Sequence, residues 1–236
     1  MKQAYLTIDD SPTIDFKHKV NFLLEKNIPC VFFCEGQRIL DFMDDVITAI
    51  TKGFAIENHS WNHPDFDTLT QEEIRSQIVR TDTLIDELYH RAGIIRDQKL
   101  FRFPYLRKGA ENKSFAQSVL EELGYTQPHF STITYEWYQQ EGFQNELDVV
   151  CTYDSMDWTV ANGSHMFGIK NLQDLLMRMD ENEPEGRRGL NYPYSNEIIM
   201  MHDIPSISSC FNPMIERLLE KGIKFCPIPG RMDGRL

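Results

Sequence analysis

The chain has 236 residues, 41% of them hydrophobic and 25% charged, which is an ordinary globular composition that can bury a sizeable core. No stretch approaches the roughly 18 consecutive apolar residues of a membrane span. The 36 acidic and 24 basic residues give a net charge of −12, which disfavours binding to nucleic-acid phosphates or anionic lipid.

The first residues, Met1–Ile8, contain neither the apolar run nor the small-residue cleavage site of a signal peptide. We therefore expect a cytoplasmic protein, unless a leader has been removed. The five cysteines include no CxxC pair, which suits a reducing compartment. Cys30 and Cys34 would lie about 13 Å apart on a strand, beyond disulfide reach, so the cysteines are expected to be small buried hydrophobes.

Short apolar or β-branched runs recur along the chain and predict strands. They are Ala4–Ile8, Pro29–Cys34, Phe54–Ile56, Leu100–Phe103, Val149–Thr152, Ile198–Met201 and Lys224–Ile228. Helical patterns lie between most of them, at Phe16–Lys26, Thr70–Tyr89, Ser114–Leu123 and Asn212–Lys221. Thr70 and Glu73 have the spacing of a capping box, and Gly124 and Gly222 are expected to end the helices that precede them.

Strands that alternate with helices predict an α/β fold with mostly parallel strands. The pattern alone leaves two architectures open, a (β/α) barrel and an open doubly wound sheet. Segments 125–147 and 159–196 break the alternation and are expected to form long loops with short elements of their own. No linker, low-complexity tract or internal repeat divides the sequence, so residues 1–236 are predicted to form one domain.

Polar clusters follow five of the predicted strands. They are Asp9-Asp10, His59 with His63, Arg102–Tyr105, Asp154 with Asp157, and His202-Asp203. In a parallel α/β fold these positions gather at the carboxyl ends of the strands, where the active sites of such folds lie. The five segments are therefore expected to converge on one cleft.

The spacing of His59 and His63 brings the two imidazoles onto one face if the segment is helical. Such a pair alone more often consists of surface or core histidines, and it needs a third ligand to hold a metal. Two histidines and one carboxylate with an open position form a catalytic zinc arrangement. Asp9-Asp10 can supply the carboxylate, because a cation removes the cost of burying two adjacent like charges. A helix N-cap would account for one of these acids but not both.

The polar clusters resemble the five ordered motifs of the polysaccharide deacetylases, also called carbohydrate esterase family four or nodulation-protein-B-type deacetylases. The segments that carry the resemblance are Thr7–Pro12, His59–His63, Arg102–Tyr105, Asp154–Trp158 and Met200–His202. The resemblance implies a distorted TIM-like (β/α) barrel and metal-assisted hydrolysis of an N-acyl group, commonly the N-acetyl group of an amino sugar.

Carried over by position, the resemblance makes Asp10, His59 and His63 the ligands of one divalent ion. Zinc is expected there, and cobalt or nickel can substitute in such a ligand set. Asp9 would be the general base, and His202 would be the general acid that protonates the leaving amine.

The resemblance also implies supporting roles for other residues of the motifs. Arg102 would buttress Asp9, and Asp157 would hold the imidazolium of His202. The backbone N–H of Tyr105 would join the metal in an oxyanion hole. The small acyl group would be enclosed by Trp158 and Met200.

The sequence departs from the family pattern at Ser11, where the family usually has a glycine that serves a tight turn. The acidic partner of His202 also has two candidates. Asp157 follows a clean apolar run and is preferred, but Glu136, which precedes Trp137, could fill the same role.

Three functions remain open at this stage. The leading one is a metal-dependent deacetylase that acts on an N-acetylated oligosaccharide or polysaccharide. The second is an amidase or deformylase that acts on a small nitrogenous metabolite, which cytoplasmic placement would favour. The third is a carbohydrate-binding relative without activity. Neither the substrate nor the oligomeric state follows from the sequence.

Overall fold

Parallel strands form the centre of the computed structural model, which describes residues 1–183 and 189–230. The strand order is β3–β2–β1–β5–β4, and β6 also pairs with β1. The strands are β1 Gln3–Ser11, β2 Cys30–Cys34, β3 Ala55–Asn58, β4 Tyr153–Asp154, β5 Glu197–His202 and β6 Lys224–Phe225. Each pairing between these strands is parallel, as the sequence predicts.

Extended segments between β3 and β5 continue the sheet and curl it into a distorted barrel. Phe101 bridges Asn58 on one side and Asp148 on the other. The Val149 N–H donates to the Phe101 carbonyl at 2.8 Å, and the Thr152 N–H donates to the Ile198 carbonyl of β5 at 2.9 Å. Residues 148–154 thus bond to Phe101 at one end and to β5 at the other, and so link the two edges of the sheet. The sequence left barrel and open sheet undecided, and the structure is the barrel.

Two segments that were predicted to be strands do not form regular strands. Leu100–Phe103 contributes only the bridge at Phe101, because the Glu57 carboxylate takes the Leu100 N–H at 2.9 Å. Val149–Thr152 is extended but bonds to a different neighbour at each end, and the paired strand β4 begins one residue later, at Tyr153.

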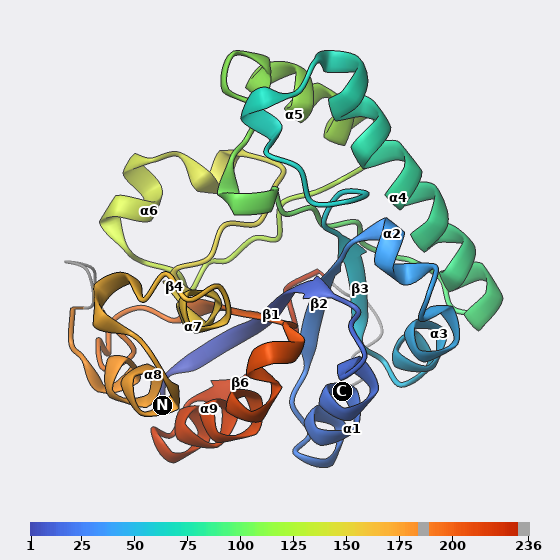
Figure 1. Cartoon of the computed structure of the whole chain (residues 1–236). Coiled ribbons are helices and arrows are strands. Elements are labelled where there is room, and N and C mark those ends of the chain that lie inside the picture. Colours follow the sequence, from blue (N-terminus) through green and yellow to red (C-terminus); the bar gives the residue numbers. More distant parts are fainter. Residues whose placement is uncertain (184–188, 231–236) are drawn as a thin grey trace.

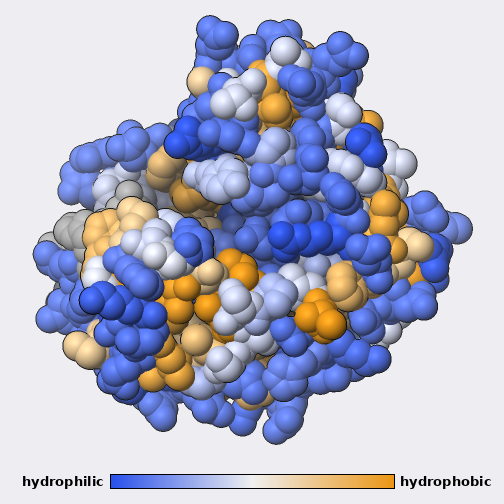
Figure 2. Space-filling model, viewed as in Figure 1, coloured by the Kyte–Doolittle hydropathy of each residue, from blue (hydrophilic) through white to orange (hydrophobic). Residues whose placement is uncertain are grey.

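Helices surround the strands (Figure 1). They are α1 Phe16–Glu25, α2 Gly36–Ile39, α3 Met43–Thr51, α4 Gln71–Ala92, α5 Lys113–Glu122, α6 Glu136–Gln140, α7 Asp157–Ala161, α8 Leu172–Asp180 and α9 Ser208–Glu220. Figure 2 shows mostly hydrophilic side chains at the centre of the viewed face, with hydrophobic ones below. None of the described helices is both long and apolar enough to cross a membrane.

The four predicted helices are confirmed as α1, α4, α5 and α9. Thr70 caps α4 through its side chain, and Glu73 returns the bond to complete the capping box. Gly124 and Gly222 follow α5 and α9 with φ of 79° and 72°, the left-handed conformation that ends helices. α2 and α3 were not predicted. The expected loop 159–196 contains α8, while its residues 184–188 lie outside the described part, and one domain over 1–236 stays a prediction.

The alternation of side chains along β1 decides what enters the barrel. Leu6 and Ile8 pack outward in the cluster that includes Phe16 of α1. Residues of the opposite face point inward, and there both Thr7 and Asp9 contact the Arg102 guanidinium. The carboxyl end of β1 therefore places one carboxylate inside the barrel at its mouth.

Candidate active site

Loops that follow β1 and β3 bring Asp10, His59 and His63 together. The Asp10 Oδ1 atom lies 3.2 Å from His63 Nε2 and 3.5 Å from His59 Nε2. One ligand atom of each residue lies within 4.8 Å of the others. The predicted convergence is therefore present in the structure.

The two histidines do not meet on a helix, as the spacing had suggested. Ser60 and His63 adopt left-handed φ of 69° and 57° in an irregular loop. The Ser60 hydroxyl accepts the His63 N–H at 3.1 Å and closes this turn. A tight loop thus achieves the proximity that one helical face would have given.

The cluster has the features of a cation site. The His59 Nδ1 atom is 2.8 Å from the Arg102 carbonyl, which places the ring proton there and leaves the Nε2 lone pair toward Asp10. Asp10 Oδ1 is buried and has no hydrogen-bond donor within residues 1–183 and 189–230. A carboxylate oxygen that two imidazole nitrogens approach without bonding it fits an ion shared by all three.

Electrostatics prepare two of these groups for metal binding. Burial alone would raise the pKa of Asp10, but the nearby imidazoles of His59, His202 and His63 hold it well below its ordinary value. Burial and the neighbouring His59 lower the pKa of His63 to about 4. Asp10 is therefore ionised and His63 neutral, which are the forms that coordinate a metal.

Asp9 lies beside the cluster in a different environment. The Arg102 Nη1 atom donates to its Oδ1 at 2.6 Å, and Oδ2 is 3.9 Å from His59 Nε2. Arg102 is fully buried, donates also to Thr7, and stacks over the Phe33 ring at 4.4 Å. This ion pair fixes Asp9 inside the barrel and leaves its second oxygen toward the cavity.

His202, at the end of β5, is held by Asp157 at the start of α7. Its Nδ1 atom is 2.6 Å from Asp157 Oδ1, and its backbone N–H donates to Oδ2 at 2.9 Å. Burial would lower the pKa of His202, but the charge and hydrogen bond of Asp157 raise it to about 10. Glu136, the alternative partner, is exposed on α6 and accepts a bond from Gln140. The structure therefore pairs His202 with Asp157.

Tyr105 lies in a 3₁₀ turn, Pro104–Leu106, at the cavity wall. The Leu106 and Arg107 N–H groups are used inside this turn, each at 3.0 Å, and Pro104 has none. Tyr105 itself has a φ of 56°, and its exposed ring lies 4.5 Å from that of His63. The turn thus holds the Tyr105 backbone beside a metal-ligand candidate.

One cavity of about 1010 Å³ is lined by the predicted ligands, base and acid and by Tyr105, namely Asp9, Asp10, His59, His63, Tyr105 and His202. Arg102 and Asp157 are not among its lining residues. Its walls include both side chains expected around the acyl group, Trp158 and Met200. Asp154 also lines the cavity and accepts the Trp158 indole N–H at 3.2 Å. Sequence reasoning assigned Asp154 no role, although it stood in the motif.

The sequence analysis missed Arg38 altogether. Its guanidinium lines the cavity and donates to the Asp10 carbonyl at 2.5 Å. Nothing in the sequence around α2 signals this contact, because it joins residues 28 positions apart.

Ser11 replaces the usual glycine without backbone strain. The left-handed residue of this turn is Asp10, with a φ of 61°, and Ser11 is not among the residues of positive φ. Ser11 continues β1, and its carbonyl accepts the Glu35 N–H at 2.8 Å. The position does not require glycine.

Comparisons with known proteins identify the family to which the chain is related. A family model described as polysaccharide deacetylase matches residues 1–128. A peptidoglycan-N-acetylglucosamine deacetylase of Bacillus cereus is 31% identical over 104 residues, which are 44% of this chain and 36% of that protein. This chain thus spans about a third of the length of that curated relative.

Solved structures share the fold over 95% of this chain. A family 4 carbohydrate esterase from Streptomyces lividans, in complex with acetate, superposes with a TM-score of 0.65 at 22% identity and 91% coverage of its own chain. A family 4 pseudoenzyme from Bacillus anthracis gives 0.64 at 20% identity and 63% coverage of its chain. At these identities the likeness establishes the distorted barrel, and it extends to a member without activity.

Proposed function

Because the chain belongs to the polysaccharide deacetylase family, we propose that it is a metal-dependent hydrolase that removes an N-acetyl or other N-acyl group from an amino sugar within an oligosaccharide or polysaccharide. One observation carries this proposal. Asp9 and His202 line the same cavity as the Asp10–His59–His63 cluster, so a base and an acid would both face a substrate bound there.

A divalent ion, when bound by Asp10, His59 and His63, supplies Lewis acidity toward the acyl carbonyl and acidifies water. Zinc suits two imidazoles and a carboxylate, and cobalt or nickel would be accepted by the same ligands. The buried Asp10 Oδ1 atom, approached by two imidazole nitrogens, supports this ligand set.

Asp9 would take the proton of the attacking water. Its Oδ1 atom is engaged by Arg102, so Oδ2 is the oxygen that faces the cavity. A carboxylate fixed in this way keeps its orientation, and positioned bases contribute about 10²–10⁴-fold to rate.

His202 would donate a proton to the nitrogen of the leaving amine. A pKa near 10 keeps its imidazole protonated at neutral pH, and Asp157 fixes the ring through Nδ1, so that Nε2 carries the transferable proton. The backbone N–H of Tyr105 would donate to the developing oxyanion, a contact whose loss typically costs about 10²–10³ in rate.

The size of the cavity favours a sugar over a small amide. Its volume of about 1010 Å³ is at the upper end of the range for ligand pockets, roughly 300–1,000 Å³. Trp158 and Met200 would border the acyl group. Cytoplasmic placement stays a prediction.

A non-catalytic role is the main competing function, since one structural neighbour is a pseudoenzyme. Loss of activity commonly accompanies loss of a ligand, base or acid. Every residue proposed for those tasks is present here and lies at the site, which favours an active enzyme.

The test is acetate release by the purified chain after loading with Zn²⁺ or Co²⁺. N-acetylglucosamine oligomers and a series of small amides should be assayed side by side. We expect metal-dependent release from the oligomers that His59→Ala abolishes. Turnover of small amides alone would favour the amidase, and metal binding without any turnover would favour the non-catalytic relative.

A further inference from the structure

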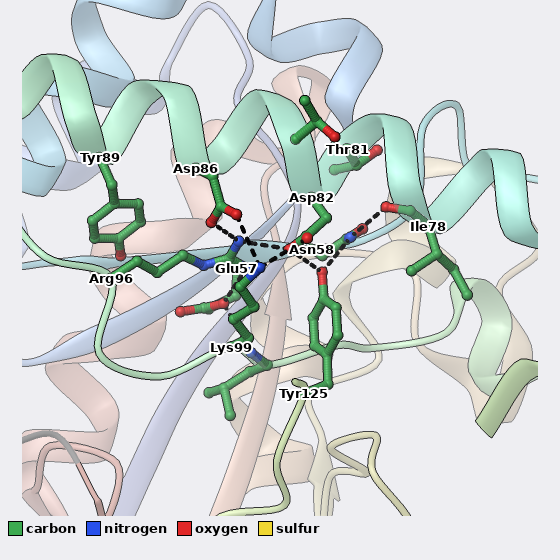
Figure 3. A network of polar contacts seen from close by, with 12 residues as sticks. Glu57, Asn58, Ile78, Thr81, Asp82, Asp86, Tyr89, Arg96, Lys99 and Tyr125 are labelled. Atoms are coloured by element: carbon green, nitrogen blue, oxygen red, sulfur yellow. Dashed lines mark hydrogen bonds and ion pairs between the residues drawn. The ribbon is translucent and has the colours of Figure 1, made fainter. Parts of the chain in front are cut away.

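A largely buried polar network joins α4 to Glu57 and Asn58 at the end of β3 (Figure 3). α4 contributes Asp82 and Asp86, which face the cations of Arg96 and Lys99. The Arg96 guanidinium also bonds Glu57 of β3 at 3.0 Å. None of these five charged residues lines the cavity.

Asn58 is the contact between this network and the metal-ligand candidates. It immediately precedes His59 and is fully buried. Its Oδ1 atom accepts the Ser60 N–H at 2.8 Å, and its backbone carbonyl accepts the Arg102 N–H at 3.1 Å. Ser60 in turn accepts the His63 N–H.

Through these contacts, the side-chain amide of Asn58 fixes the backbone at both His59 and His63. His59 lies between Asn58 and Ser60, so the Asn58–Ser60 bond closes a turn around its Cα atom. Ser60 has a left-handed φ of 69°, which a residue with a side chain keeps only where its surroundings fix it. The backbone at His63 depends on the same Ser60. A change in the orientation of the Asn58 side-chain amide would therefore displace both imidazoles.

Residues of the polar network determine which way the Asn58 side-chain amide points. Its Nδ2 atom donates to the Tyr125 hydroxyl at 2.7 Å and to the Ile78 carbonyl at 3.0 Å. The Tyr125 hydroxyl donates to Asp82 Oδ1 at 2.9 Å. Asp82 is ion-paired to Arg96 and Lys99 and can only accept, so the hydroxyl must point its proton at Asp82 and its lone pair at Asn58.

We propose that Tyr125, acting through Asn58, is a positioning residue that orients His59 and His63 for metal binding. The proposal rests on the metal site of the proposed function. Tyr125 is not one of the residues that line the cavity, and its role is to keep the Asn58 oxygen on the Ser60 N–H. Partners of this kind commonly change metal affinity by about 10–100-fold when they are removed.

The decisive variant is Tyr125→Phe, which keeps the ring against Phe101 and removes only the hydroxyl. Its matched control is Tyr89→Phe. Tyr89 is equally buried, and its hydroxyl accepts the Ile56 N–H at 3.1 Å, so the control also removes a buried hydroxyl that bonds β3. That bond lies three residues before His59 and outside its turn.

The measurement is the dissociation constant for Co²⁺, by competition with a chromophoric chelator, together with the melting temperature of the metal-free protein. We expect Tyr125→Phe to bind Co²⁺ about 10-fold more weakly or worse. Tyr89→Phe should lose comparable thermal stability and keep the wild-type affinity. Excess Co²⁺ should restore much of the Tyr125→Phe turnover.

Three results would overturn the proposal. They are an affinity of Tyr125→Phe within twofold of wild type, equal affinity losses in the two variants, and no Co²⁺ binding by the wild-type protein. Only the last also contradicts the proposed function. If Tyr125→Phe does not fold, Asp82→Asn tests the same contact, because an amide no longer fixes the direction of the Tyr125 hydroxyl. The same affinity loss is expected, and wild-type affinity would refute the proposal.

Discussion

Asp157→Asn is the sharpest test of the proposed proton donor. The substitution preserves the size of the side chain and leaves an oxygen that can still accept the His202 N–H. It removes the charge that, with its hydrogen bond, raises the pKa of His202 to about 10. Burial, the largest single influence on that pKa, then acts with much weaker opposition.

The expected shift is large. Without the Asp157 charge, the pKa of His202 should fall to its ordinary value of 6.5 or lower. At pH 8.5 the protonated fraction would change from nearly all molecules to about one in 100, because two pH units above a pKa correspond to a hundredfold excess of the neutral form. A bound divalent cation lowers the pKa in both proteins, so their difference persists.

The assay is the pH profile of kcat/KM for the metal-loaded wild type and variant. The alkaline limb should move down by about three pH units or more, while activity near pH 6 changes less and metal affinity stays near wild type. Glu136→Gln is the control, because Glu136 is exposed and bonds only within α6. An alkaline limb that stays in place in Asp157→Asn would refute the assignment, as would one that moves in Glu136→Gln.

Three further predictions address metal binding and stability. Asp9→Asn should keep the metal and lose most turnover, whereas His59→Ala should lose the metal. Metal analysis with an activity assay tests both, and metal loss in Asp9→Asn with retention in His59→Ala would reverse the roles of base and ligand. Free Zn²⁺ at 100 times its dissociation constant should stabilise the wild type by about 2.7 kcal/mol, raising its melting temperature by roughly 5–10 °C, and should leave His59→Ala unchanged. Lys19→Met should cost about 3–5 kcal/mol in denaturant unfolding because it strands the fully buried Asp203, whereas Lys17→Met on the exposed side of α1 should cost less than about 0.5 kcal/mol.

Local signals in the sequence were sufficient for much of the fold. The apolar runs of β1, β2, β3 and β5 are each long enough to be recognised, and the capping box of α4 involves only neighbours in the chain. Predictions were less accurate where distant groups decide the structure. Leu100–Phe103 has the composition of a strand, yet the Glu57 carboxylate takes its first amide. The helix predicted at Asn212–Lys221 begins earlier, because α9 starts at Ser208 and accommodates Pro213 inside.

In the candidate site, too, some features could be predicted from local sequence and others depend on distant residues. The residues expected to converge do so, because strand ends in a parallel barrel share one rim. The contacts of Arg38 with Asp10 and of Tyr125 with Asn58 join positions 28 and 67 residues apart. No spacing or motif in a single sequence reports such pairs, so the orientation of the ligands could not be foreseen.

Asp9 and Asp10 show how one backbone angle can separate the surroundings of two neighbours. Along a regular strand, Asp10 would share the outward face with Ile8 and be buried among the apolar residues of α1 and α9, where an ionised carboxylate is costly. Its φ of 61° turns the side chain toward the two histidines instead, while Asp9 keeps the inward face and its bond to Arg102. Aspartate tolerates this conformation better than most residues, and the bond from Arg38 to the Asp10 carbonyl helps to hold it. The adjacent acids can therefore face the same cavity from different surroundings, one among the metal-ligand candidates and the other paired to a buried guanidinium.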